Sequence, residues 1–449
     1  MQGSTLQSKR YLGLLAVAAL VGVVVSLAAW GFLRLVTLLQ EGVYTDLPGE
    51  LGFDHAPLWW SLPVCALAGL PVALAIAWLP GRGGHVPAHG LSAGVTQPRE
   101  LPGVVLAGLA SVGLGLVLGP EGPLIALGGG LGLLAARLAR ADANADAAAV
   151  LSAAGAFAAL SLIFQSPLIA AVILIEVTGL GGPRLPLVLL PGLMAAGIGS
   201  LISIGMGSWT GLSTSDYALG VLPVGDFARP DASDFAWTVP LAVAIALGCV
   251  VVFRLARVAE RLTQRRPFLG VPAAGLVVAG LAIAFTEATD KGVDEVLFSG
   301  QDQVGGLIAN AGAWSLGALA LLLLLKGIAW CICLGSFRGG PTFPAMFLGA
   351  AAGLMAGQLP GFADTPAVAV GIGAAVVAVL GTPLSAVLFA TVLTASTAPG
   401  AAPLIILGVV AAYLTSKAAA GRLAPEPAPA PGRQGPAAET PSPAVAAPS

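Results

Sequence analysis

Long apolar stretches that hold almost no charge are the feature that most constrains how this chain can fold. Five of them approach or exceed roughly 20 residues, the length that spans the hydrocarbon of a bilayer: residues 11–32, 59–79, 101–118, 239–253 and 316–334. Hydrophobic residues make up 57% of the chain and charged residues 9%, against roughly a quarter charged in soluble domains. We therefore predict an all-α, multi-pass membrane protein surrounded by lipid, in a cell inner membrane or plasma membrane.

The few charges suggest an orientation for the chain. Lys9 and Arg10 precede the first apolar stretch, and since no cleavage site is evident after it, we expect a retained first helix. The positive-inside rule places these two residues in the cytoplasm. A basic run between residues 254 and 266 could bind nucleic acid, but the end of a membrane helix explains it better, so no nucleic-acid partner is expected. The run consists of Arg254, Arg257, Arg261, Arg265 and Arg266.

Metal, cofactor and catalytic patterns are not evident in the sequence. The four cysteines lie in apolar surroundings, and the three histidines, His55, His85 and His89, do not add up to a zinc pattern with them. No Ser-His-Asp spacing is apparent, and the glycine runs lie inside apolar helices rather than after a strand. We expect no metal, no cofactor and no enzymatic activity, and a small anion such as chloride as the ligand.

Two short segments in the first half of the chain recur in the second half. Residues 121–132 read EGPLIALGGGLG and residues 342–353 read TFPAMFLGAAAG, an offset of 221 that aligns a proline and two glycines. Residues 166–172 (SPLIAAV) match residues 382–388 (TPLSAVL) at an offset of 216. Chains rich in alanine, glycine and leucine produce chance matches, but two matches in the same order at nearly the same offset indicate a duplication.

This duplication divides the chain into five parts. They are an N-terminal part with the first membrane helix (1–58), a first membrane repeat (59–212), an inter-repeat loop (213–235), a second membrane repeat (236–421) and a disordered, Pro/Ala-rich cytoplasmic tail (422–449). The tail's composition cannot bury enough apolar surface to offset the entropy of ordering it.

Both copies place glycine and proline at the start of a short apolar stretch, which is typical of helices that begin partway through the membrane. In transporters, interrupted helices at matching positions of two halves mark the binding site. The free N–H groups and positive dipole end of such a helix favour an anion. Glycines further along each segment more plausibly allow close helix packing. For the clusters at residues 83–87, 119–123 and 339–344 we predict an anion site, since interrupted backbone at membrane depth is buried or lines a cavity.

These three clusters, in this order, resemble motifs of the CLC family of chloride channels and transporters. Residues 119–123 (GPEGP) look like the family's Gly-Arg-Glu-Gly-Pro, residues 339–344 (GGPTFP) like Gly-x-Phe-x-Pro, and residues 83–87 (GGHVP) like Gly-Ser-Gly-Ile-Pro. With residues 165–177 (QSPLIAAVILIEV), the resemblance extends over about residues 34–422. It implies an inverted repeat of tilted and broken transmembrane helices and a homodimer with one pore in each subunit.

The resemblance also implies roles for individual residues. Glu121 would be the gate, because an ionised side chain can occupy the anion site and leave when it is protonated or displaced. A carboxylate costs about 2.5 to 3.5 kcal/mol at the bilayer centre, so it needs a function or a partner; a purely structural, hydrogen-bonded glutamate is the alternative. Glu176 would be a secondary acidic site. The expected anion-binding residues are Gly83, Gly84, His85, Gly122, Gly340, Thr342 and Phe343.

Several positions depart from the family pattern. Gly84 stands where the family has an anion-binding serine, and His85 beside it could either supply an N–H donor or only face a vestibule. Pro341 has no backbone N–H to offer an anion, whereas Thr342 replaces the motif phenylalanine and could restore a hydroxyl. The family's pore tyrosine near the last helix has no counterpart, since Tyr413 lies too early.

Val177 stands where proton-coupled exchangers of the family carry a second glutamate, directly after Glu176. An apolar side chain offers no proton relay, so we predict a passive channel for chloride or a similar small anion. The alternatives are a proton-coupled chloride exchanger and a fluoride exporter of the same family. A cation transporter would need several intramembrane carboxylates, and this chain offers only Glu121 and Glu176.

Overall fold

The computed structural model describes residues 9–90, 95–139, 145–179, 185–210 and 219–421. These residues are helical and form no strand, apart from one antiparallel bridge between Gly119 and Gly340. The predicted tail lies outside the described residues, as does the first part of the expected inter-repeat loop, and α10 already begins at Ala232, inside the range expected for that loop.

The first half begins with a long helix and continues with shorter ones. A π-helical turn (Gly42–Asp46) follows α2, and 3-10 turns (Leu58–Trp60, Pro80–Gly83, Pro87–His89 and Pro98–Glu100) separate the next helices. The helices are α2 (Lys9–Glu41), α3 (Leu47–Glu50), α4 (Ser61–Trp78), α5 (Leu101–Gly113), α6 (Glu121–Leu138), α7 (Ala145–Phe164), α8 (Pro167–Thr178) and α9 (Leu185–Thr210).

The last four helices of the second half repeat the order of the last four of the first half, with the shortest helix third in each set. Two further 3-10 turns (Val293–Glu295 and Ala311–Ala313) connect its elements. The helices are α10 (Ala232–Gln264), α11 (Pro267–Thr289), α12 (Gln303–Ala309), α13 (Leu316–Ser336), α14 (Thr342–Gly357), α15 (Asp364–Leu380), α16 (Pro383–Leu393) and α17 (Ala398–Gly421).

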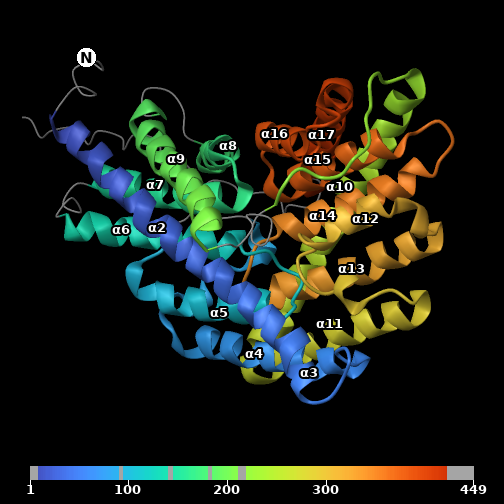
Figure 1. Cartoon of the computed structure of the whole chain (residues 1–449), viewed down its shortest axis with the longest axis horizontal. Coiled ribbons are helices and arrows are strands. Elements are labelled where there is room, and N and C mark those ends of the chain that lie inside the picture. The colour runs from blue at the N-terminus through green and yellow to red at the C-terminus, as the bar shows by residue number, and fades with distance from the viewer. Residues whose placement is uncertain (1–8, 91–94, 140–144, 180–184, 211–218, 422–449) are drawn as a thin grey trace, which may run out of the picture.

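Helix length separates two classes of element. Eight of the described helices are long and apolar enough to cross a membrane, whereas the apolar helices α8, α14, α15 and α16 have 10 to 17 residues. Because a full crossing needs about 20 residues, these four are shorter than a typical membrane span. Figure 1 shows the two halves side by side, with the first half in blue to green and the second in lime green to red. Helix α4 packs on α11 where they meet.

Glycines bring equivalent helix pairs into close contact in the two halves. A Cβ added to Gly128 of α6 would lie 2.4 Å from the carbonyl oxygen of Gly155 in α7, and one added to Gly349 of α14 would lie 2.4 Å from that of Gly371 in α15. Gly128 and Gly349 are separated by the repeat offset of 221 residues. This contact supports the packing role predicted for these glycines and the duplication itself.

A lysine buried in α13 holds the loop beside the two broken helices. Lys326 is fully buried, and its Nζ donates to the carbonyl oxygens of Glu295 (2.9 Å), Val296 (3.2 Å) and Leu297 (3.0 Å) and lies 4.4 Å from the ring centre of Phe347 in α14. The same loop is bound to the chain that precedes α6, because the backbone N–H of Phe298 donates to the carbonyl oxygen of Gly115. Lys326 was not predicted as an anchor from the sequence, although it is the one charge in an apolar 21-residue helix.

We expect Lys326→Met to destabilise the protein by about 3 to 5 kcal/mol, because the carbonyl oxygens lose their donor and stay buried. Thermal unfolding in detergent, followed by the loss of helical circular dichroism, measures the effect. Lys291→Met is the matched control, since Lys291 is only partly buried, bonds to one carbonyl and lies over one ring, that of Trp314. Equal shifts for both variants would show that Lys326 is not a structural anchor.

Candidate functional site

The starts of the two broken helices α6 and α14 meet at the middle of the fold. Gly119 and Gly340 exchange two backbone hydrogen bonds, with N···O distances of 2.8 and 2.6 Å. These glycines are also 221 residues apart, so they occupy equivalent positions in the two repeats. The bridge therefore fixes the two helix starts against each other.

Neither helix start carries a side-chain cap of its own. Pro120 precedes α6 and Pro341 precedes α14, and neither can cap with a side-chain oxygen. The first N–H groups of a helix have no intrahelical partner and carry a partial positive charge. Two such starts, buried together, form an environment that favours a negative group.

Glu121 supplies that negative group. Its side chain is 1% exposed, and its Oε1 accepts a hydrogen bond of 2.5 Å from the backbone N–H of Thr342, the first residue of α14. The other oxygen, Oε2, is buried and has no hydrogen-bond partner. The carboxylate of one repeat thus occupies the helix start of the other, bound through one oxygen.

Gly340 and Gly119 lie directly against this carboxylate. A Cβ added to Gly340 would lie 1.9 Å from Cδ of Glu121, and one added to Gly119 would lie 2.0 Å from its Oε2. No side chain fits between either glycine and the carboxylate. The absence of a Cβ at both positions is what allows a negative group to approach the backbone so closely.

A pocket of about 190 Å³, called the central pocket below, opens beside this arrangement. It brings together four of the predicted anion-binding residues, from the first motif and from the start of α6: Gly83, Gly84, His85 and Gly122. Gly339 and Pro341 of the third motif also line it. The remaining predicted residues, Gly340, Thr342 and Phe343, surround the carboxylate of Glu121 instead.

The first motif reaches the central pocket through an unusual backbone. Gly83 and Gly84 have φ of +79° and +97°, a region that L side chains rarely adopt. A serine at residue 84 would be strained in this conformation, which explains why the family's serine is missing. His85 donates from Nε2 to the carbonyl oxygen of Gly90 at 2.8 Å, so this N–H is already used within the loop.

Glu176 lies away from the central pocket, at the start of α16. Its Oε1 accepts from the backbone N–H of Leu384 (3.0 Å) and its Oε2 from that of Ser385 (2.6 Å). The carboxylate therefore caps α16. These hydrogen bonds join α8 of the first repeat to α16, the equivalent short helix of the second repeat. Val177, the next residue, is part of the apolar packing.

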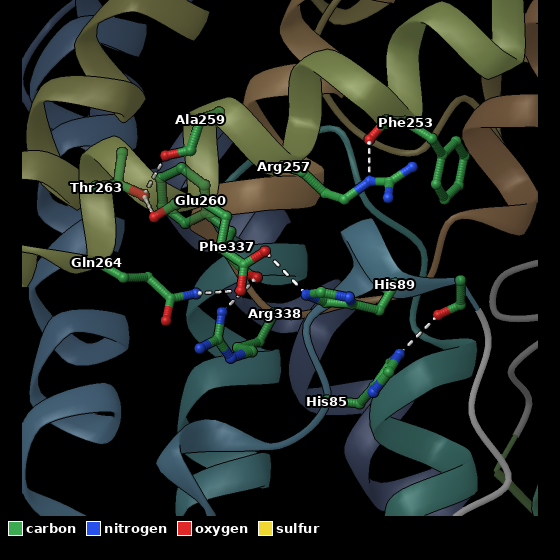
Figure 2. Close-up of polar contacts among 11 residues, drawn as sticks. His85, His89, Phe253, Arg257, Ala259, Glu260, Thr263, Gln264, Phe337 and Arg338 are labelled. Carbon is green, nitrogen blue, oxygen red and sulfur yellow. Dashed lines mark hydrogen bonds and ion pairs between the residues drawn. The ribbon is translucent and has the colours of Figure 1, made fainter. Parts of the chain in front are cut away.

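Arg338 is a residue of the central pocket that the sequence analysis did not single out. It is 2% exposed and lines the pocket between the end of α13 and the start of α14. The signal was present in the sequence, since Arg338 is the one charge between a long apolar helix and the Gly-Gly-Pro cluster. Figure 2 shows Arg338 near His85, His89 and Glu260.

Comparison with known proteins agrees with this arrangement of broken helices. The sequence pattern of the family described as "Voltage gated chloride channel" matches residues 86–417. This chain belongs to the CLC family. Two relatives named YfeO are described as ion-transport proteins, one from Escherichia coli (strain SMS-3-5 / SECEC) and one from Shigella boydii serotype 4 (strain Sb227). They are 29% and 30% identical to this chain over 344 residues, which cover 75% of this chain and 77% of each relative.

Solved structures of CLC proteins share the fold. A slow cyanobacterial Cl⁻/H⁺ antiporter superposes with a TM-score of 0.70 at 19% identity, over 91% of this chain and 95% of that one. A CLC-type fluoride/proton antiporter gives 0.66 at 16%, over 91% and 96%. The predicted all-α CLC fold is thereby confirmed. The chain is a multi-pass membrane protein of an anion-transporting family of channels and transporters.

Proposed function

We propose that this protein is a passive, glutamate-gated channel for chloride or a similar small monovalent anion. The observation that carries the proposal is the carboxylate of Glu121, bound to the uncapped start of α14 beside an open pocket. A group held there by one backbone N–H can be replaced by an anion that uses the same N–H. Gly122, Gly340, Thr342 and Phe343 then form the inner part of the anion site, and Gly83, Gly84 and His85 form its entrance.

The entrance lies beside the basic end of α10. His89, which precedes the pocket residue Gly90, contacts Glu260 of α10 at 2.9 Å, and the arginines of the basic run surround Glu260 in the sequence. By the positive-inside rule this end of the protein faces the cytoplasm. We place the protein in a cell inner membrane or plasma membrane, with the central pocket open toward the cytoplasm.

A homodimer with one pore per subunit is part of the proposal. Helices α8 and α16 are short, contact each other and expose Leu168 (64%) and Leu384 (61%) near their starts. Helix ends in hydrocarbon would leave backbone groups unsatisfied, so a partner subunit suits this face better than lipid.

Flux from reconstituted liposomes tests the proposed function. Liposomes loaded with chloride, fluoride or nitrate are diluted into anion-free buffer, and anion release and external pH are recorded together. Release of chloride with no matched change in pH is expected. Fluoride release well above chloride release would favour the fluoride exporter, and an absence of release for all three anions would contradict anion transport by this chain.

A second candidate, the proton-coupled exchanger, is favoured by the Cl⁻/H⁺ antiporter among the structural relatives. We expect no coupling, because Val177 offers no proton relay and Glu176 is occupied as the cap of α16. The measurement imposes a chloride gradient on sealed liposomes, clamps the voltage with an ionophore and follows proton movement. Uphill proton transport that scales with chloride flux and vanishes in Glu121→Ala would make the protein an exchanger.

A further inference from the structure

Arg338 is a buried cation whose position is fixed by the backbone around it. Its guanidinium donates from Nε to the carbonyl oxygen of Arg82 (3.3 Å) and from Nη1 to that of Phe337 (3.1 Å). Its own backbone N–H donates to Oγ of Ser111 (3.1 Å). The side chain is therefore held at the wall of the central pocket and cannot move to solvent to lower its energy.

The charge of Arg338 has no carboxylate partner among the residues that the structure describes. The negative charge of Glu260 acts on Arg338 from a distance, but no ion pair within 4.0 Å joins the two side chains. Glu260 instead contacts His89 at 2.9 Å and accepts from Gln264 at 3.5 Å (Figure 2). An arginine stays charged in proteins, and burying a charge without a partner is strongly unfavourable. A counterion is the simplest compensation.

The central pocket offers the place for that counterion. Arg338 and Gly84 both line it. Glu100 is the one acidic residue that lines the pocket, and its Oε2 accepts from the backbone N–H of Gln97 (3.1 Å), so it acts as a local cap rather than as a partner for Arg338. The terminal nitrogen Nη2 of Arg338 has no acceptor in the described part of the chain, which leaves N–H donors free toward a ligand.

We propose that Arg338 directly binds the transported anion in the central pocket and sets which anions bind well. This inference rests on the proposed function. Arg338 supplies a hydrogen-bond donor to a site in which Gly84 replaces the family's serine and Pro341 has no backbone N–H. Because a guanidinium presents a planar set of donors, it binds planar oxyanions through two hydrogen bonds, which an ammonium cannot do. Arg338 therefore favours nitrate relative to chloride more than a lysine would.

Anion binding to the purified full-length protein in detergent tests the proposal. Isothermal titration with sodium chloride, and separately with sodium nitrate, is done in gluconate buffer. We expect Arg338→Gln to weaken chloride binding about tenfold, because a charge-assisted hydrogen bond is lost. Arg257→Gln is the matched control: Arg257 is exposed on α10 and bonds only to the carbonyl oxygen of Phe253. It removes the same charge at the same end of the protein and should leave binding unchanged.

A lysine variant keeps the test decisive if Arg338→Gln fails to fold. Arg338→Lys retains the charge, so chloride binding should stay within about threefold of the wild type, while nitrate binding falls about tenfold because the planar donor set is lost. Equal changes for the two anions, or none, would overturn the proposal. Liposome flux separates this proposal from the proposed function. If the wild type transports anions but anion binding is unchanged in the Arg338 variants, the proposed function stands and the role of Arg338 is wrong.

Discussion

A Glu121→Gln protein is expected to release chloride from liposomes several times faster than the wild type, at a rate that no longer depends on external pH. The carboxylate accepts from the N–H of Thr342 and, in the proposed gate, competes with the anion for it; a hydrogen bond to a charged group is roughly twice as strong as one to a neutral group. The amide has the same shape but binds that N–H more weakly, so an anion displaces it. In the wild type, protonation of Glu121 does the same, and flux should therefore rise as the pH falls.

Glu176→Gln is the matched control for this prediction, because Glu176 is the other intramembrane glutamate and also accepts from backbone N–H groups, those of Leu384 and Ser385. Its loss should lower stability and leave the pH profile of flux in place. Unchanged flux and an unchanged pH profile in Glu121→Gln, at normal expression, would mean that Glu121 is a structural glutamate.

Gly340→Ala is expected to lower anion flux by about tenfold or more. The new methyl group would lie 1.9 Å from the present position of Cδ of Glu121, which is the position that we propose for the anion when the gate is open. Overpacking a tight site costs about 1 to 3 kcal/mol, and each 1.4 kcal/mol is a factor of ten in binding. Since the flexible Glu121 side chain can move aside, the fold should survive while the anion site is filled.

The double variant Gly340→Ala, Glu121→Ala separates a blocked site from a simple clash. If the methyl group fills the anion site, removal of the carboxylate will not restore flux. Full recovery in the double variant would show that the two side chains only collide and that the anion passes elsewhere. Gly248→Ala in α10 is the control, since a Cβ there meets nothing within 4 Å; liposome flux and gel-filtration profiles are measured for all variants.

Features that depend on neighbouring residues could be predicted from the sequence. Apolar stretches without charge require a membrane, and Gly-Pro clusters prevent a helix from continuing, so four of the spanning helices and the starts of α6 and α14 were foreseen. The stretch 101–118 was wrong as a span, because it holds only the 13-residue helix α5. The duplication was visible because matching residues recur at one offset. These features also placed Glu121 and the three glycine clusters in one predicted anion site.

The contacts that complete the site join residues more than 200 positions apart, and only the tertiary structure decided them. Glu121 binds the start of α14 rather than that of its own helix, Gly119 pairs with Gly340, and Glu176 caps α16. Local sequence cannot indicate these partners, because each depends on how the two repeats pack. For the same reason Arg338 read as an ordinary charge near a helix end. Only the folded chain shows that it is buried, without a carboxylate, in the wall of the central pocket.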